Sequence, residues 1–395
     1  MNILKKTGKS FYFNDKCDNI CVVTNIIKKS EDIMKKLLSL MLVMVLGISV
    51  LTGCSGGSDS GSNTYELALI TDVGTIDDKS FNQGAWEGLV EYATENDITH
   101  KYYQPSEKTT DAYLSSIDLA VKAGAKVIVT PGYLFEPAVF KAQDTYPDVK
   151  FILLDGTPQD GTYTEFKLND NVYSVFYAEE QAGFLAGYAA VKEGDTKLGF
   201  MGGMAVPAVV RFGYGFVQGA EYAAKEMGIT GLEVKYNYTG DFKATPEVQS
   251  KAASWYQGGT EVIFACGGAV GNSVMAAAEA SDGKVIGVDV DQSPESATVI
   301  TSAMKMLGQS VYDAIAAYYG DSFPGGVSAT LGADVDGVGL PMETSKFEVF
   351  TQADYDAIYA KLVAGEISMM KDKDGEKEVK LSDIPVSAVK VEEIA

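Results

Sequence analysis

From Tyr65 onward, short runs rich in β-branched and aromatic residues alternate with longer amphipathic stretches, and no other feature of the chain limits its fold as strongly. This pattern predicts parallel strands joined by helices, because each helix supplies the crossover between two strands. Strands are predicted at residues 65–71, 126–130, 149–154, 198–201, 232–236, 261–265 and 284–288. Helices are predicted at residues 81–95, 209–227, 246–256 and 270–280. We therefore expect an α/β protein.

Polar or glycine residues follow almost every predicted strand. Asp72, Asp155 and Asp289 come directly after three of them, and glycine pairs follow two others at residues 202–203 and 267–268. Ligands of open parallel sheets bind beyond the carboxyl ends of the strands. A ligand site is therefore expected at this edge.

The chain is long enough for two domains. About 330 residues follow residue 63, more than the roughly 250–300 residues at which a single core stops growing. A change of composition at residues 171–179 leads into the apolar, glycine-spaced segment 181–191, where we expect the chain to cross between domains. The tail at residues 370–378 predicts an exposed hairpin around Lys373-Asp374-Gly375, to which no chemistry is assigned.

Residues 34–54 resemble a bacterial lipoprotein signal. Lys35 and Lys36 precede an apolar run that ends at Leu51-Thr52-Gly53-Cys54 and is shorter than the roughly 20 residues of a spanning helix. The resemblance implies export, removal of the signal peptide 34–53 and a lipid such as palmitate on Cys54. Residues 1–33 carry four acids and fit this signal poorly, so we expect translation to start at Met34. Residues 54–63 are expected to form a flexible Gly/Ser tether that reaches about 15–20 Å.

Charge and rare residue types exclude several classes of protein. Without residues 1–53 the chain keeps 24 basic and 50 acidic side chains, a net charge of about −26 that argues against nucleic acid as a partner. It also argues against membrane docking by charge alone, so a lipid anchor is needed. The single histidine, His100, lies in a predicted strand, which disfavours a histidine-based catalytic triad or zinc site. Arg211 is the only arginine, and Cys266 is the only cysteine after Cys54.

Two aromatic residues lie near the start of predicted helices at matching places in the two halves of the chain. Phe81 follows Asp77-Asp78-Lys79-Ser80 and precedes Asn82, with Ser80 predicted as the N-cap. Phe212 lies in the segment 206–220, and the two rings could face each other across a cleft. The alternatives are a core position for Phe81, a second cap at Asn82 and mere helix packing for the glycines 215 and 219.

A third group of residues suits a sugar. Asp289 at a strand end could accept hydrogen bonds from paired hydroxyls, and Lys305 would keep it ionised. Gly267-Gly268 do not have the spacing of a dinucleotide fingerprint. The alternative for Asp289 is a solvated turn acid.

Residues 77–88, 207–220, 264–272, 287–292 and 301–305, together with the lipoprotein signal, resemble the basic membrane protein family of lipoproteins. Its best-understood members are purine nucleoside-binding receptors of ABC importers. The resemblance covers essentially everything from Tyr65 onward. It implies a two-lobed, type I periplasmic-binding-protein fold with hinge strands. Lobe 1 would comprise residues 64–172 plus about 292–321, and lobe 2 would comprise residues 173–291 plus about 322–395.

The resemblance also implies roles for particular residues. Phe81 and Phe212 would sandwich a purine ring, and Asp78 and Asn82 would meet its polar edge. The ribose would be held by Asp289, Lys305 and Gly268. We expect an extracytoplasmic monomer without enzymatic activity, cofactor or metal, which passes adenosine, guanosine or inosine to a membrane permease and its ATPase.

Three alternatives remain open. The same fold could bind riboflavin or a free sugar, since an aromatic clamp accepts other flat rings. The protein could instead report a ligand to a membrane kinase or chemoreceptor. An extracellular nucleoside hydrolase is the third, because Asp72, Asp77 and Asp78 resemble a carboxylate cluster.

Overall fold

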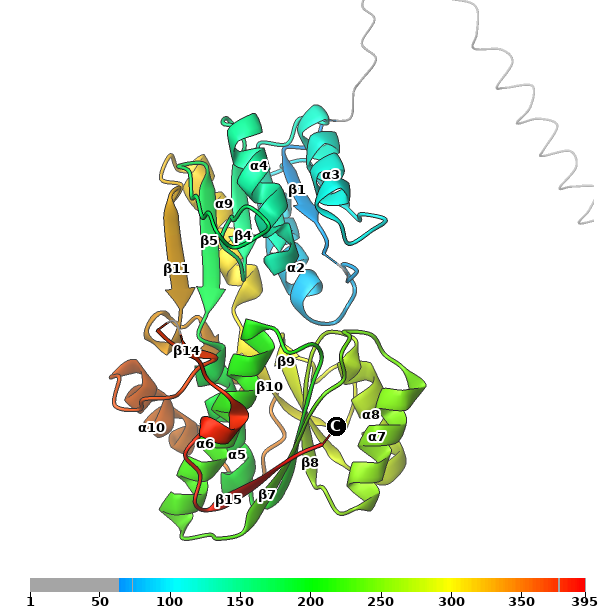
Figure 1. Ribbon diagram of the computed structural model, residues 1–395, viewed down its shortest axis with the longest axis vertical. Coiled ribbons are helices and arrows are strands. Elements are labelled where there is room, and N and C mark those ends of the chain that lie inside the picture. Colours follow the sequence, from blue (N-terminus) through cyan, green and yellow to red (C-terminus); the bar gives the residue numbers. More distant parts are fainter. Residues whose placement is uncertain (1–63, 73, 376, 395) are drawn as a thin grey trace, which may run out of the picture. The chain divides into compact units, whose positions relative to one another are not determined.

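The computed structural model describes residues 64–72, 74–375 and 377–394 (Figure 1). The predictions for the upstream extension, the signal, Cys54 and the tether concern residues 1–63 and lie outside the described residues. In the described part of the chain, every helix is too short or too polar to cross a bilayer.

Six parallel strands form the first sheet, in the order β11-β5-β4-β3-β1-β2. Leu67 and Leu69 of β1 share a core with α2 (Phe81–Glu95) and α9 (Leu307–Tyr319). Ala68 and Ile70 share another with α3 (Thr110–Lys122) and α4 (Glu136–Thr145). Helices therefore cover both faces, which is why the central strands β1, β3 and β4 are buried along almost their whole length. The strands are β1 (Leu67–Ile70), β2 (His100–Tyr103), β3 (Val127–Pro131), β4 (Lys150–Leu154), β5 (Val172–Tyr177) and β11 (Val327–Leu331).

Seven strands form the second sheet, in the order β12-β10-β9-β8-β6-β7-β15, with only β12 antiparallel to its neighbour. One face packs against α5 (Glu179–Glu193) and α6 (Pro207–Met227), and the other against α7 (Pro246–Gln257) and α8 (Val270–Ser281). The strands are β6 (Lys197–Gly202), β7 (Leu232–Tyr238), β8 (Val262–Cys266), β9 (Lys284–Asp289), β10 (Val299–Lys305), β12 (Val338–Gly339) and β15 (Val389–Glu393).

The predicted elements are confirmed with ends shifted by at most two residues, and the tail forms the predicted hairpin from β13 (Lys373–Asp374) and β14 (Lys377–Glu378). Strands β5, β10, β11, β12 and β15 were not predicted. Helices α3, α4, α9 and α10 (Gln352–Val363) were also missed, and segment 181–191 lies inside α5.

Strand pairing differs from the expected lobe limits at three places. Strand β5 pairs with β4, so residues 173–177 belong to the first sheet. Strand β10 pairs with β9 in the second sheet, although residues 292–321 were expected in lobe 1. Strand β11 pairs with β5 in the first sheet, although residues 322–395 were expected in lobe 2. The chain changes sheets only after a strand is complete, which places the crossings near residues 178, 306 and 332–337.

Four glycines hold α5 and α6 at close range. A Cβ added to Gly183, Gly187, Gly215 or Gly219 would lie 2.0 to 2.1 Å from a backbone oxygen of the other helix. The packing interpretation of Gly215 and Gly219 is therefore confirmed. This contact joins residues 180–187 of α5 to residues 212–219 of α6.

Candidate functional site

Lys305, the last residue of β10, is the centre of a buried charge cluster. Its side chain is 2% exposed, and its Nζ lies 2.5 Å from Asp155 Oδ2, 3.2 Å from Glu179 Oε1 and 3.9 Å from Asp289 Oδ1. Asp155 follows β4 of the first sheet, Glu179 begins α5, and Asp289 ends β9 of the second sheet. Carboxyl ends of strands from both sheets therefore meet at one ammonium group, as expected for a ligand edge.

Three aromatic rings surround the same ammonium. The Lys305 Nζ lies 4.8 Å from the ring centroid of Phe81, 5.3 Å from that of Tyr177 and 5.5 Å from that of Phe212. These distances fall within the roughly 6 Å over which a cation is attracted to a ring face. The structure thus brings Phe81, Phe212, Asp289 and Lys305, four of the predicted ligand-binding residues, to one place.

Burial and charge act in opposite directions on the groups of this cluster. Burial raises the pKa of Asp155 to about 6, although the Lys305 ammonium opposes that shift. Burial likewise raises the pKa of Asp289, again against Lys305. Burial lowers the pKa of Lys305, but Asp155, Glu179 and Asp289 outweigh it, so its pKa lies above the ordinary value. Lys305 therefore stays charged at neutral pH.

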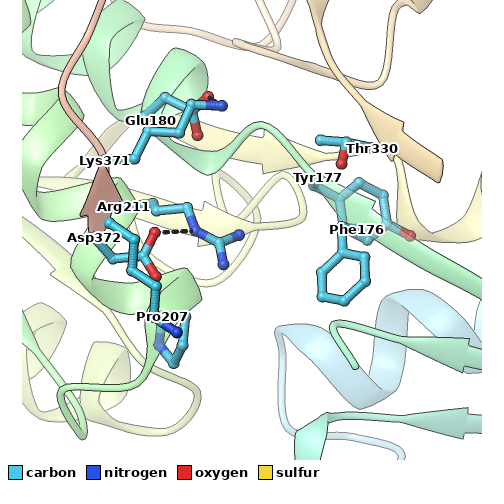
Figure 2. Close-up of a pocket in the computed structure, with 9 residues that line it drawn as sticks. Phe176, Tyr177, Glu180, Pro207, Arg211, Thr330, Lys371 and Asp372 are labelled. Carbon is cyan, nitrogen blue, oxygen red and sulfur yellow. Dashed lines mark hydrogen bonds and ion pairs between the residues drawn. The ribbon is translucent and has the colours of Figure 1, made fainter. Parts of the chain in front are cut away.

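Arg211 adds a second cation to the cluster. Its Nη1 donates a 2.8 Å hydrogen bond to Glu179 Oε2, and its Nε donates a 2.8 Å hydrogen bond to Asp372 Oδ1 in the tail (Figure 2). Glu179 is fully buried, and its Oε2 pairs with Arg211 while its Oε1 lies 3.2 Å from Lys305 Nζ. This shared carboxylate links α6 to β10.

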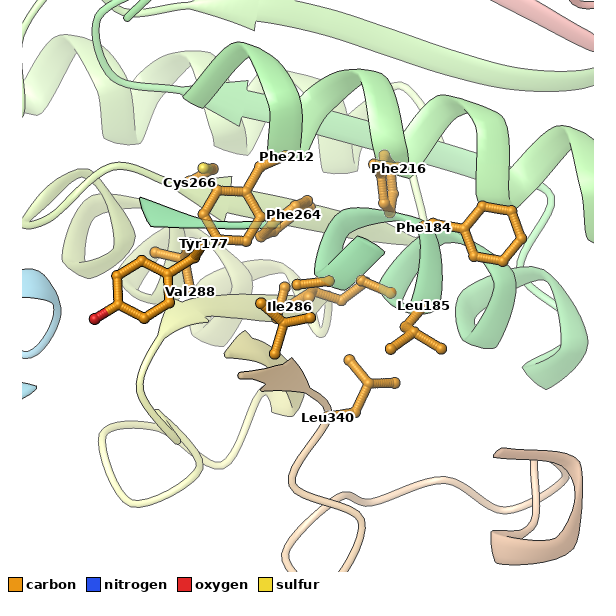
Figure 3. Packing of buried hydrophobic residues seen from close by; sticks show 14 of the residues in the cluster. Tyr177, Phe184, Leu185, Phe212, Phe216, Phe264, Cys266, Ile286, Val288 and Leu340 are labelled. Atoms are coloured by element: carbon orange, nitrogen blue, oxygen red, sulfur yellow. The ribbon is translucent and has the colours of Figure 1, made fainter. Parts of the chain in front are cut away.

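Phe212 is more deeply buried than Phe81. Its ring is 1% exposed and meets Phe264 edge-to-face, with centroids 5.9 Å apart and planes at 85° (Figure 3). Phe81 is only partly buried. The Phe212 ring is therefore part of the core of the second sheet as well as a neighbour of Lys305.

The turn before α2 is organised by carboxylates. Asp78 Oδ1 accepts hydrogen bonds from the backbone N–H groups of Ser80 and Gln83, and Asp78 Oδ2 accepts from the backbone and side-chain amides of Asn82. The Asn82 amide also donates to Asp72 Oδ1 at 2.9 Å. Asp78 therefore supplies the cap of α2, and Asn82 ties the turn to the end of β1.

The prediction that the Ser80 side chain caps α2 is wrong. Among the described residues it makes no capping hydrogen bond, and its hydroxyl donates instead to Asp289 Oδ2. A charged acceptor makes a stronger hydrogen bond than a backbone group. Ser80 thereby joins the first helix to the end of β9.

Further contacts join the same two segments. Gln292 Nε2 donates a 2.6 Å hydrogen bond to the Lys79 carbonyl, and Lys79 Nζ lies 3.4 Å from Glu295 Oε1. The segment 79–80 therefore contacts the segment 289–295 through both backbone and side chains.

Both aspartates that meet Lys305 at strand ends have a left-handed backbone. The φ angle is +52° at Asp155 and +67° at Asp289. Such angles are uncommon outside glycine and cost energy, so they persist where surrounding contacts impose them and often mark functional sites. Asp155 Oδ1 is buried without a hydrogen-bond partner in the described part of the chain.

Gly268 lies in the turn between β8 and α8. Its φ is +53°, and a Cβ there would lie 3.4 Å from the Phe242 carbonyl oxygen. A side chain would be strained at this position. Its backbone therefore belongs to the loops that follow the strands of the second sheet.

Sequence reasoning missed three members of the cluster. Asp155 had been noted only as a strand-end residue, and the rule that ligands bind at strand ends could have selected it. Tyr177 and Glu179 carried no such signal, because β5 was not predicted. Their roles depend on how that strand crosses into α5.

Cys266 is a buried free cysteine, and it lies close enough to Asp289 to be affected by its charge. Over residues 64–72, 74–375 and 377–394, His, Cys, Asp and Glu do not gather in any group of three or more suited to a metal ion. Burial raises the pKa of the Cys266 thiol, with the Asp289 charge adding to the shift, so the thiol stays protonated.

Comparison with known proteins places the chain in a family. The family model for PnrA-like ABC transporter substrate-binding proteins, Bmp, matches residues 65–373. The nucleoside-binding protein BmpA of an ABC transporter from Lactococcus lactis subsp. cremoris is 29% identical, over 80% of this chain and 93% of its own. Basic membrane protein A2 of Borrelia garinii subsp. bavariensis is 30% identical, over 85% of this chain and 97% of its own.

A solved structure agrees with this assignment. The crystal structure of an ABC transporter system solute-binding protein from Aeropyrum pernix K1 has a TM-score of 0.65 and 25% identity, covering 78% of this chain and 94% of its own. The match supports the two-lobed α/β fold with helices on both faces of each sheet. The chain therefore belongs to the Bmp family of PnrA-like substrate-binding proteins of ABC transporters, which act outside the cytoplasm and are not enzymes.

Proposed function

We propose that this protein is a lipid-anchored receptor that captures a purine nucleoside, adenosine, guanosine or inosine, between its two lobes for an ABC importer. The observation that carries the proposal is the cluster in which Lys305, Asp289 and the rings of Phe81 and Phe212 meet where the two sheets face each other. A flat ring with attached hydroxyls suits such a site. The relative named as a nucleoside-binding protein supports the same ligand class.

Each predicted residue has a role in this proposal. Phe81 and Phe212 stack on the two faces of the base, and the turn held by Asp78 and Asn82 lies along its polar edge. Asp289 accepts hydrogen bonds from the ribose hydroxyls, Lys305 donates to a ribose oxygen, and the Gly268 backbone lines the sugar pocket. Ligand hydroxyls would then compete with Ser80 for Asp289.

The energies of these contacts are large enough. Stacking contributes roughly 1 to 3 kcal/mol for each aromatic face, and a hydrogen bond to a charged group contributes about 1.5 to 3 kcal/mol. Micromolar affinity requires about 8 kcal/mol, after the costs of ordering are met. Two stacked faces and several charged hydrogen bonds reach this value.

Nucleosides are favoured over nucleotides. Lys305 and Arg211 are the cations of the cluster, and both already face carboxylates. A phosphate placed there would meet Asp155, Glu179 and Asp289 at close range. A ligand without phosphate avoids that repulsion.

The remaining parts of the proposal concern the assembly. The polypeptide crosses from one lobe to the other near residues 178, 306 and 332–337. These crossings act as the hinge. Cys54 carries the lipid, and the tether keeps the monomeric receptor within reach of a permease and its ATPase.

Calorimetry on ligand-free protein tests the proposal. We expect micromolar or tighter binding of at least one of adenosine, guanosine and inosine, and weaker binding of the corresponding monophosphate. The Phe81→Ala variant should bind at least tenfold more weakly. Phe166→Ala serves as the control, because this exposed phenylalanine lies outside the cluster. No binding of any of the three nucleosides would refute the proposal.

A further inference from the structure

The C-terminal segment at residues 370–373, here called the strap, contacts helices α5 and α6. Lys371 Nζ lies 2.6 Å from Glu180 Oε1, and the Gln218 side chain makes hydrogen bonds of 2.8 and 2.9 Å with the backbone of Met370. Just beyond the strap, the Tyr214 hydroxyl donates to the Val379 carbonyl at 3.0 Å. Contacts from both helices therefore hold the strap in place.

The strap and Arg211 line one wall of a cavity of about 380 Å³ (Figure 2). Phe176 of β5 and Thr330 of β11 line it as well, and both lie close to hinge crossings. The strap therefore lies beside two of the three crossings that we propose as the hinge.

An alternating series of charges runs from the strap to the ligand cluster. Asp372 Oδ1 lies 2.8 Å from Arg211 Nε, and Arg211 Nη1 lies 2.8 Å from Glu179 Oε2. The other oxygen of Glu179 lies 3.2 Å from Lys305 Nζ, which reaches Asp155 at 2.5 Å. The side chains of Arg211 and Asp372 are each only 17% exposed, so solvent screens this series weakly.

Arg211 helps to neutralise the Glu179 carboxylate, whose charge Lys305 would otherwise have to balance alone. Asp155, Glu179 and Asp289 place three carboxylates around one ammonium. If Glu179 had no second cation, it would draw Lys305 away from Asp155 and Asp289. Asp372 holds the Nε of the guanidinium, and because the fork of donors is rigid, this contact keeps Nη1 on Glu179 Oε2.

We propose that Asp372 and Arg211 are positioning residues of the ligand site, which set the place of Lys305 through Glu179. The strap thereby contributes to the geometry of the ligand site. The effect on ligand affinity rests on the proposed nucleoside function, whereas the effect on the charge cluster does not.

Binding of inosine, measured by calorimetry, tests the first effect. Asp372→Asn should weaken binding about fivefold to tenfold, as expected when a charged hydrogen bond that orders a neighbouring charge is lost. Asp372→Glu should recover part of the affinity. Asp374→Asn is the matched control, since Asp374 is an exposed aspartate two residues away with no role in the cluster.

A double-mutant cycle separates positioning from simple folding of the strap. In a Glu179→Gln background, Asp372→Asn should cost little additional affinity, because the link to Lys305 is already broken. An equal loss in both backgrounds would show that the strap acts only structurally. So would equal affinities of the Asp372→Asn and Asp374→Asn variants.

A titration without ligand tests the second effect and holds even if no nucleoside binds. The Asp155 carboxyl can be followed by carbon NMR in the apo protein, where it faces Lys305, Glu179, Asp289, Arg211 and Tyr177. In the Asp372→Asn variant Arg211 is no longer held on Glu179, so Lys305 shifts toward Glu179 and away from Asp155. The Asp155 midpoint should then rise by roughly half a unit, because this loss outweighs the smaller downward effect of removing a more distant carboxylate. An unchanged midpoint would overturn the proposal, whatever the binding data show.

Discussion

Replacing Gly219 by alanine should separate two helices that now touch through their backbones. An alanine Cβ at this position would lie 2.0 Å from the Phe184 carbonyl oxygen and 2.8 Å from its carbon. Close carbon–oxygen contacts in proteins are about 3.3 Å or longer. The atoms in the way belong to the backbone of α5 and cannot rotate aside. Helices α5 and α6 must therefore move apart by roughly 1 Å.

The expected cost follows from the packing that this movement removes. A gap of about 0.5 to 1 Å forfeits a quarter to a half of each dispersion contact across it, and overpacked core positions typically lose about 1 to 3 kcal/mol. The higher helix propensity of alanine offsets up to about 1 kcal/mol of this loss. We expect a net loss of about 2 kcal/mol in the free energy of unfolding, since the contact is between backbones.

Urea denaturation of matched variants measures this loss. The control is Gly271→Ala in α8, where the nearest atom to an added Cβ is 3.7 Å away. That variant should be unchanged or more stable by up to about 1 kcal/mol. If Gly219→Ala proved as stable as Gly271→Ala, the close approach of α5 and α6 would be refuted.

Three other predictions concern the charge cluster around Lys305 and the rings beside it. Phe212→Ala should lower the free energy of unfolding by about 3 to 5 kcal/mol, and Phe81→Ala by clearly less because Phe81 is only partly buried; equal losses in denaturation would contradict the different burial of the two rings. Lys305→Met should destabilise the protein by about 3 to 5 kcal/mol at pH 7, and by less at pH 5, where the stranded carboxyls take up protons; a loss independent of pH would contradict the role of the cluster. The raised pKa of Asp155, about 6, means that its contribution to stability is fully present below its unfolded pKa and is lost as the pH rises through 6. Asp155→Asn should therefore show a smaller decline in unfolding free energy between pH 4 and pH 7 than the natural protein, and parallel profiles from denaturation at each pH would contradict this.

The architecture could be predicted from sequence because its signals are local. Period-two and helical patterns each extend over one element, so strands such as β8 and helices such as α2 were located within a residue or two. Strands β5 and β11 were missed. Both carry half-exposed or polar residues, and β11 lies at the edge of its sheet, where alternation is weak.

The candidate site likewise contains residues that could be identified from the sequence and residues that could not. Four site residues each belong to a short local sequence motif: Phe81, Phe212, Asp289 and Lys305. The structure brings these four residues together. Asp155, Glu179 and Asp372 reach the same cluster from segments far apart in the sequence. Nothing in the sequence near Asp372 indicates that it contacts the only arginine.

Fold class, family motifs and the sheet edge at which a ligand site is expected could all be predicted from the sequence, because each depends on patterns within tens of residues. The folded arrangement was needed to show which carboxylates face Lys305, and that the Ser80 hydroxyl donates to Asp289 instead of capping its own helix. Charge balance in a buried cluster depends on distances between segments more than a hundred residues apart. Those distances are set by how the strands cross between the two sheets.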